Sequence, residues 1–410
     1  MGLALFLSIY GISYPNNVLS LEDILEIAKV SNPQVKIEKL NTEIKRKDKD
    51  KALKNYLLPP VTFSDSDEWS TIKKYGLGAK SLSASIDIFK GGADVNDYKV
   101  KKTNLAVAEN NEILAELSAQ EQAAAAYFAV LNARKQSEIT DSATALLAKQ
   151  RDRTWDLYSN GKLVPKSEYL KIESEIEKSK IINFENRENE INTMGILARI
   201  LGYPIDAQLV LEDFDSGAYL KKKADIEKRA KKPVEETILG KNEKYTLDIA
   251  EYEVKKAKAE LYPTITMSFE HNFAERDKEE GWRKVDEDRF ELGFSWEFEW
   301  GGTLDDIESK KYSYEQAKTA YEDNIKGIAL NMRNQLNRVK SLYGQSVVAK
   351  KQAELLEENM KLDGMRYENE LLSTFDYLNS VNSYREAEEN YYRTQRELVL
   401  AVIQYENLYR

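Results

Sequence analysis

The chain has 410 residues, a formal net charge of −10 and no cysteine. Aromatic residues make up 10% and charged residues 32% of it, which is too aromatic for a disordered chain and too charged for a helical membrane protein. The acidic balance, without a basic stripe, argues against a nucleic-acid partner. The absence of cysteine excludes disulfides and thiolate metal sites, and the 8 prolines and 18 glycines favour long uninterrupted elements.

Residues 1–18 contain an apolar stretch, residues 3–12, that has the length of a signal-peptide core. It is too short to cross a bilayer, and it lacks a basic flank and an Ala-x-Ala site. We interpret it as the remnant of an export signal, with an ordinary buried N-terminal segment as the alternative. No other stretch holds about eighteen consecutive apolar residues, so any membrane crossing must use strands.

The rest of the chain presents the same order of signals twice, first over residues 19–201. A helical stretch over residues 21–58 comes first. Two strand-like stretches follow within about residues 60–89, and a Gly-Gly pair then opens a long helical hairpin over residues 93–201.

The second copy occupies residues 234–410 and follows a mixed segment, residues 202–233. We expect that segment to form a small lateral, equatorial subdomain. The second copy again has a leading helix, strands within about residues 263–300, a Gly-Gly pair and a long hairpin over residues 303–408. The sequence therefore predicts two structural repeats.

The first arm of each hairpin is very long. A helix over residues 93–158 would measure about 100 Å, more than a compact domain of this size can bury. Its apolar residues recur at intervals of three and four, as in Leu114, Leu117, Ala124, Phe128 and Leu131. This spacing predicts a coiled-coil-like seam with neighbouring helices.

The four strand-like stretches alternate apolar and polar residues, which predicts one apolar and one polar face. We assign to a lipid-facing side Ile86, Ile88, Phe269, Phe294, Trp296 and Phe298. We assign to a water-filled lumen Asp87, Glu270, Glu291, Glu297 and Glu299. These lumen carboxylates either tune ion selectivity or simply wet the interior.

Alternation alone fits a second arrangement equally well, a soluble sheet whose apolar face packs on helices. The long helices, which are expected to pack on one another, favour the membrane arrangement. Four strands cannot close a barrel, and an open edge cannot face lipid. Three chains would supply twelve strands, enough to leave a lumen.

A series of short motifs, in this order and with this duplication, resembles the TolC-like outer-membrane efflux protein family, the outer membrane factors. The motifs are Leu-Ser-Leu-Glu-Asp-Ile at 19–24, Ser-Asn-Pro-Gln at 31–34, Pro-Val-Thr-Phe at 60–63, Phe-Lys-Gly-Gly at 89–92, Leu-Gly-Tyr-Pro at 201–204, Trp-Gly-Gly at 300–302, and the hairpin breaks that begin at residues 158 and 367. The resemblance covers nearly the whole chain from residue 19 onward.

The resemblance implies a mixed α/β membrane protein. Its four antiparallel strands per chain would contribute to a trimeric 12-stranded β-barrel, continuous with a long coiled-coil α-barrel built from two helical hairpins per chain. It implies a homotrimeric channel in the outer membrane of a Gram-negative bacterium, with the helical part in the periplasm. The channel would be the passive exit duct of a tripartite efflux or type I secretion system, whose other parts are an inner-membrane pump and a periplasmic adaptor protein.

The resemblance also implies that the hairpin tips form a periplasmic aperture that opens by untwisting of the coiled coils. Carried over by position, the tip residues are Gly161, Leu163, Val164, Pro165, Glu370, Leu371, Leu372, Ser373, Thr374 and Asp376. Asp376 matches a position that often contributes to an acidic ring. Asn379 stands where a second acid is sometimes found, and Glu370 stands where many relatives have glycine.

The sequence offers no catalytic constellation, cofactor motif or metal-ligand spacing. The single histidine, His271, is interpreted as packed or interfacial because it lies on the apolar face of a predicted strand. The protein is therefore expected not to be an enzyme and to need no cofactor. The alternative to the channel is a soluble periplasmic coiled-coil scaffold or adaptor protein.

Overall fold

The structure is a computed structural model that describes residues 18–70, 75–161, 164–215, 217, 219, 232–277, 281–297, 299, 301–369 and 371–410. Nearly all of the predicted export signal and part of the predicted lateral segment, residues 202–233, lie outside these residues.

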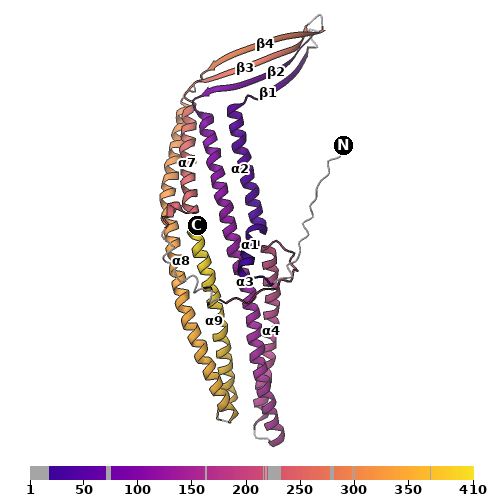
Figure 1. Cartoon of the computed structure of the whole chain (residues 1–410), viewed down its shortest axis with the longest axis vertical. Helices are drawn as coiled ribbons and strands as arrows, with labels where there is room; N and C mark the ends of the chain where they lie inside the picture. Colours follow the sequence, from indigo (N-terminus) through magenta and orange to yellow (C-terminus); the bar gives the residue numbers. More distant parts are fainter. Residues whose placement is uncertain are drawn as a thin grey trace. The chain divides into compact units, whose positions relative to one another are not determined.

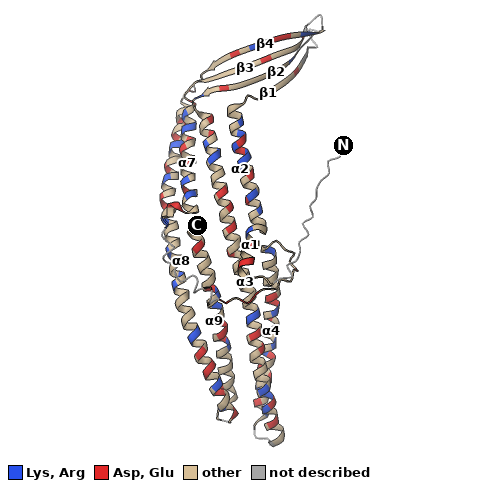
Figure 2. Cartoon of the chain, viewed as in Figure 1, with Lys and Arg blue, Asp and Glu red and all other residues tan. Residues whose placement is uncertain are grey.

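Long helices and one four-stranded antiparallel sheet make up the described chain, which confirms the predicted fold class (Figure 1). Lysine, arginine and acidic residues are spread along all the long helices (Figure 2). Within the described residues, no helix contains a stretch long and apolar enough for a bilayer crossing. In chain order the elements are α1 (Leu21–Ser31), α2 (Pro33–Leu57), β1 (Val61–Ser70), β2 (Tyr75–Lys90), α3 (Ala93–Gly161), α4 (Lys166–Ile200), η1 (Val234–Glu236), α7 (Ile238–Ala259), β3 (Thr264–Asp277), β4 (Gly281–Ser295), α8 (Gly302–Glu368) and α9 (Thr374–Leu408).

The chain divides into two compact units, and each takes segments from both of the predicted repeats. The first unit consists of Met1–Ile37, Ile113–Pro233 and Ala329–Arg410, and the second of Glu38–Glu112 and Val234–Ile328. The first unit holds both hairpin ends, and the second holds the whole sheet.

The predicted leading helix over residues 21–58 is interrupted at Asn32. This residue has a non-helical backbone, with φ −57° and ψ 130°, because the ring of Pro33 disfavours helical geometry in the residue before it. The Asn32 side chain donates to the Ile200 carbonyl over 3.0 Å and accepts from the Gln34 amide over 2.9 Å. Asn32 thus ties the break to the end of α4.

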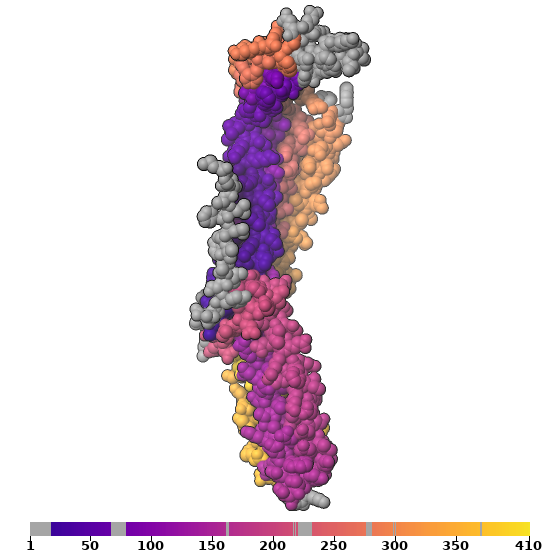
Figure 3. Space-filling view, turned by 90° about the vertical axis from the view of Figure 1, so that its right-hand side faces the viewer, coloured from indigo at the N-terminus to yellow at the C-terminus, as the bar shows by residue number. Residues whose placement is uncertain are grey.

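The core of the first unit lies where α1, α3, α4 and α9 meet, around the fully buried side chains of Tyr127, Leu131, Leu197 and Val399. The segment that follows α4 adds Ala207, Leu209 and Leu211 to this core. It is held by a parallel bridge in which Leu19 donates to the Val210 carbonyl over 2.8 Å and accepts from the Glu212 amide over 2.9 Å. Lower on the same unit, α9 contacts the α3–α4 hairpin (Figure 3).

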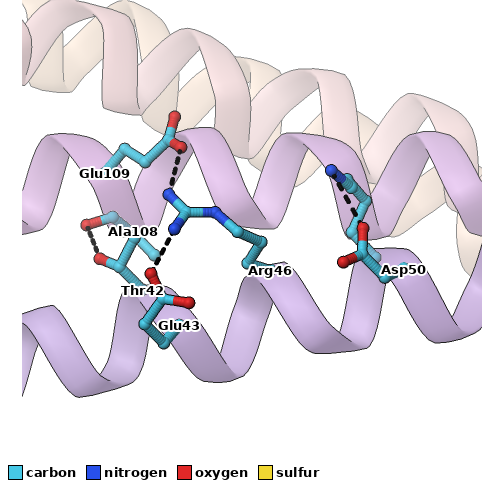
Figure 4. A network of polar contacts seen from close by, with 7 residues as sticks. Thr42, Glu43, Arg46, Asp50, Ala108 and Glu109 are labelled. Carbon is cyan, nitrogen blue, oxygen red and sulfur yellow. Dashed lines mark hydrogen bonds and ion pairs between the residues drawn. The ribbon is translucent and has the colours of Figure 1, made fainter.

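In the second unit, side-chain contacts fix the register of α2 against α3. Thr42 donates to the Ala108 carbonyl over 3.3 Å, and Arg46 bonds both Glu43 and Glu109 (Figure 4). Such exposed ion pairs contribute little stability. The buried hydroxyl of Thr42 therefore specifies the alignment more than the charges do.

The Gly-Gly pair at the end of β2 lets the strand meet α7 closely. Gly91 and Gly92 have φ angles of +59° and +85°, which glycine alone adopts without strain. A Cβ at Gly91 would lie 2.3 Å from the carbonyl oxygen of Ala259. The corresponding Gly301 has φ +103° but no atom within 4 Å of a built Cβ.

Replacing Gly91 with alanine should destabilise the protein, because it combines backbone strain with a steric clash. We expect a loss of at least about 2 kcal/mol, measured as a lower midpoint of thermal unfolding of the purified protein in detergent. Gly301→Ala should cost less, about 1 kcal/mol, because only the strain applies. Gly327→Ala within α8 should be neutral or slightly stabilising. An effect of Gly91→Ala no larger than that of Gly327→Ala would contradict this account.

Candidate functional site

The first hairpin turns between Gly161, the last residue of α3, and Lys166, the first of α4. Pro165 is the N-cap, with φ −64° and no side-chain hydrogen bond, a residue whose fixed φ suits a helix start. Of the predicted tip residues, Val164 and Pro165 lie in this turn, and Leu163 lies outside the described residues.

The second hairpin turns through Leu371, Leu372 and Ser373, and the predicted Glu370 lies outside the described residues. The Ser373 hydroxyl accepts from the Asp376 amide over 3.2 Å and donates to the Asp376 carboxylate over 2.7 Å. Asp376, the predicted ring acid, is therefore already engaged in capping α9, although it remains exposed to solvent. Leu371 is 78% exposed, and Thr374 is the buried first residue of α9.

Two polar contacts join the two hairpins just before their turns, and a third lies within the second hairpin. Arg153 of α3 donates to the Glu368 carbonyl at the end of α8 over 2.7 Å. The Thr154 hydroxyl lies 3.1 Å from the Tyr367 hydroxyl, which also accepts from Thr374 over 3.2 Å. The Tyr367 hydroxyl thus lies between α3 and the start of α9.

Glu168 extends this network from α4. Hydrogen bonds from Thr374 and Lys171 hold the pKa of the Glu168 carboxyl below its ordinary value. A pocket of about 240 Å³ opens among these residues. We refer to Arg153, Thr154, Glu168, Tyr367, Glu368 and Thr374 as the cross-hairpin cluster.

The cluster rests on an apolar base. The ring of Tyr367 stacks on that of Tyr377, with centroids 5.0 Å apart and planes at 10°. Tyr377 is buried against Leu147, Ile172 and Val381, and burial raises the pKa of its phenol to about 12. The ring stack therefore fixes the direction in which the Tyr367 hydroxyl points.

The sheet has one apolar face, as the pairing of its strands demonstrates. Cross-strand partners project on the same side of a sheet. Phe269 pairs with both Ala84 and Phe290, and Met267 pairs with both Ile86 and Leu292. Phe290, Leu292 and Phe294 are 77%, 72% and 68% exposed. Of the predicted lipid-facing residues, Ile86, Phe269 and Phe294 share this face.

The opposite face is polar. Asp87 pairs with Thr266 and accepts a hydrogen bond from its hydroxyl over 2.8 Å. Glu291 pairs with Ser268, and Glu270 pairs with Arg289. Three of the predicted lumen carboxylates, Asp87, Glu270 and Glu291, therefore lie on one face of the sheet.

Two details of the strands differ from the prediction. β4 ends at Ser295, so the predicted strand up to residue 300 is wrong at that end. Trp296, Glu297 and Glu299 follow the strand, and Phe298 lies outside the described residues. In β2 the register shifts between Asp87 and Phe89. As a consequence Phe89 pairs with Ile265, and Ile88 lies at the register shift without a paired residue on β3.

No sequence motif predicts Arg153, Thr154, Glu168 or the role of Tyr367 at this site. Tyr158 and Tyr367 were recognised only as the starts of the two hairpin breaks. Thr154 and Arg153 contact residues that lie 213 and 215 positions further along the chain. A local sequence pattern cannot predict contacts between residues so far apart.

His271 lies 2.8 Å from Asp288 on the neighbouring strand, and no group of three potential metal ligands occurs among the described residues.

Replacing Tyr367 with phenylalanine should loosen the hairpin ends without disturbing the ring stack. It removes hydrogen bonds worth about 1 kcal/mol each, so amides of residues 366–376 should exchange roughly five- to tenfold faster. Hydrogen exchange measured by mass spectrometry checks this.

The matched control is Tyr158→Phe, at the first hairpin, because the Tyr158 hydroxyl has no hydrogen bond to any described residue. That variant should leave exchange unchanged. Equal exchange in Tyr367→Phe and the natural protein would show that the Tyr367 hydroxyl does not hold the hairpin ends.

Comparison with known proteins provides independent evidence. Residues 242–408 match the model of the outer membrane efflux protein family. No curated protein sequence matches the chain. Several solved structures are similar to it in fold, and three of them are described here. The CmeC outer membrane channel of Campylobacter jejuni is 15% identical, with a TM-score of 0.78 over 95% of this chain and 85% of that one.

The MtrE outer membrane channel of Neisseria gonorrhoeae, solved in its open state, is 19% identical, with a TM-score of 0.73 over 95% of this chain and 88% of that one. The outer membrane protein VceC of Vibrio cholerae is 15% identical, with a TM-score of 0.73 over 94% of this chain and 96% of that one. The predicted resemblance is thereby confirmed: this chain carries the sequence pattern of the outer membrane efflux proteins over residues 242–408 and the fold of outer-membrane channels over nearly its whole length.

Proposed function

We propose that this chain is one protomer of a homotrimeric outer-membrane channel, the passive exit duct of a tripartite efflux or type I secretion system. The observation that carries the proposal is the sheet. It has one exposed apolar face, one polar face with carboxylates, and, within the described residues, two open edges at β1 and β4.

The open edges require further copies of the chain. Backbone N–H and C=O groups left unpaired in lipid cost several kcal/mol each, so a membrane sheet must close on itself. Four strands are too few to close. Cyclic symmetry joins the β4 edge of one copy to the β1 edge of the next, and three copies give twelve strands.

The length of the apolar face suits an outer membrane. On β3 it extends from Ile265 to Phe273, roughly nine residues at about 3.4 Å each, or about 30 Å along the strand. A tilt of about 45° reduces this to roughly 20 Å, close to the apolar band of about 25 Å in such barrels. Within this span His271 pairs with Asp288, and in the row beyond it Lys80 pairs with Asp65.

The scaffold alternative is not favoured. A soluble protein with this sheet would have to cover its apolar face, as antiparallel sheets in globular proteins do. Phe290, Leu292 and Phe294 instead remain mostly exposed within the chain. A contiguous apolar surface of this kind marks contact with a membrane or a partner.

In the proposed channel, the helical part stands in the periplasm and the two hairpin tips form the aperture. The cross-hairpin cluster supports this role, because its contacts would have to break for the hairpins to separate. Carboxylates on the polar face of the sheet would wet the lumen. The pump would supply the energy for export, and the adaptor protein would join the pump to the duct. The duct itself would need no catalytic group or cofactor.

Placing lysines on the apolar face should block assembly. In the double variant Leu292→Lys with Phe294→Lys, each charge would cost about 2–4 kcal/mol at mid-bilayer depth. We expect loss of detergent-dependent trimers from the outer-membrane fraction, measured by blue-native electrophoresis.

Ser268→Lys is the control, because Ser268 lies on the polar face beside Glu291. This variant should assemble normally. Normal assembly of the double variant, or recovery of the natural protein as a water-soluble monomer, would refute the proposed function.

A further inference from the structure

A groove separate from the hairpin ends runs between α3 and α9 in the first unit. Its volume is about 460 Å³, within the range of sites for small molecules, roughly 300–1,000 Å³. The apolar part of its wall consists of Ile139 and Leu146 from α3, Met360 from α8 and Val381 from α9. The groove thus has room for an apolar body, with α9 lying beside α3 (Figure 3).

Three cations also line the groove, Lys135, Lys149 and Arg385. The two carboxylates in its wall already have partners: Glu138 pairs with Lys135 over 3.2 Å, and Glu388 is hydrogen-bonded by Tyr384. Among the described residues, neither Lys149 nor Arg385 forms an ion pair with either of these carboxylates.

Arg385 is the more informative of these two cations. Glu389 attracts its charge, yet its Nε atom is buried without an acceptor among the described residues. A buried donor without an acceptor costs free energy, and binding an acceptor would recover it. Lys149 has no ion-pair partner among the described residues and is exposed at the groove. Its mobile ammonium can reach an anion in the groove.

We propose that this groove binds an anionic amphiphile, a small molecule with an apolar body and one carboxylate or sulfonate head. The apolar body would contact Ile139, Leu146, Met360 and Val381, and the head would accept from Arg385 and Lys149. Guanidinium groups bind planar and tetrahedral oxyanions through paired donors. In a chain of net charge −10, a local excess of positive charge beside an apolar wall selects anions of this class.

Isothermal titration calorimetry of the full chain in lipid nanodiscs tests the proposal, with naphthalene-2-sulfonate as the probe and neutral naphthalene-2-sulfonamide as its matched control. We expect one sulfonate per chain, with affinity that falls as salt rises. The sulfonamide should bind about tenfold more weakly, because it cannot form the charge-assisted bonds.

The variant Lys149→Met with Arg385→Met should lower sulfonate affinity about tenfold or more. Arg338→Met with Lys350→Met removes the same charge from exposed positions on α8 outside the groove and should leave affinity unchanged. If the groove variant fails to fold, the exposed Lys149→Met alone should weaken binding severalfold. Absence of sulfonate binding, equal binding of the sulfonamide, or equal losses in both double variants would overturn the proposal, and each would leave the channel function untouched.

Discussion

The unpaired edges of a four-stranded sheet are the constraint on which the rest of this protein depends. β1 and β4 each have one neighbour in the described chain, and one face of the sheet exposes phenylalanine and leucine to the surroundings. Neither feature is stable alone, because lipid cannot satisfy backbone hydrogen bonds and water cannot solvate the apolar face. Both are satisfied together when copies of the chain share their edges inside a membrane. The proposed trimer follows from this requirement.

In the proposed channel the helical part meets a different demand, since the hairpin ends of the proposed aperture would have to be held and yet be separable. The structure holds them with a few polar contacts above an apolar base that includes an aromatic stack. Individual hydrogen bonds of this kind contribute only about 1 kcal/mol net. Their sum is large enough to favour one arrangement and small enough for a binding partner to reverse.

The sequence predicted those structural features that come from a residue pattern repeating at a fixed interval along the chain. Alternation identified which side of each strand is apolar, because a strand repeats every two residues, and the pairing of Phe269 with Phe290 agrees with it. Helix lengths followed from the scarcity of proline and glycine. The break at Asn32 was missed, although Pro33 marks it, because the apolar pattern continues across it.

Features set by distant parts of the chain could not be predicted. The register shift at Ile88 depends on how β2 meets β3, and the hydroxyl contact of Thr154 with Tyr367 depends on two hairpins packing together. Family position suggested Asp376 as a ring acid, but only the structure revealed that its carboxylate accepts from the hydroxyl of Ser373, the N-cap residue of α9.

Hydrogen exchange along the sheet of the membrane-extracted protein tests the central claim most directly. If neighbouring copies pair with both edges, the amides of β1 and β4 will be protected to the same extent as those of β2 and β3. Rapid exchange of the outward amides of β1 and β4, with slow exchange confined to the two central strands, would contradict the account.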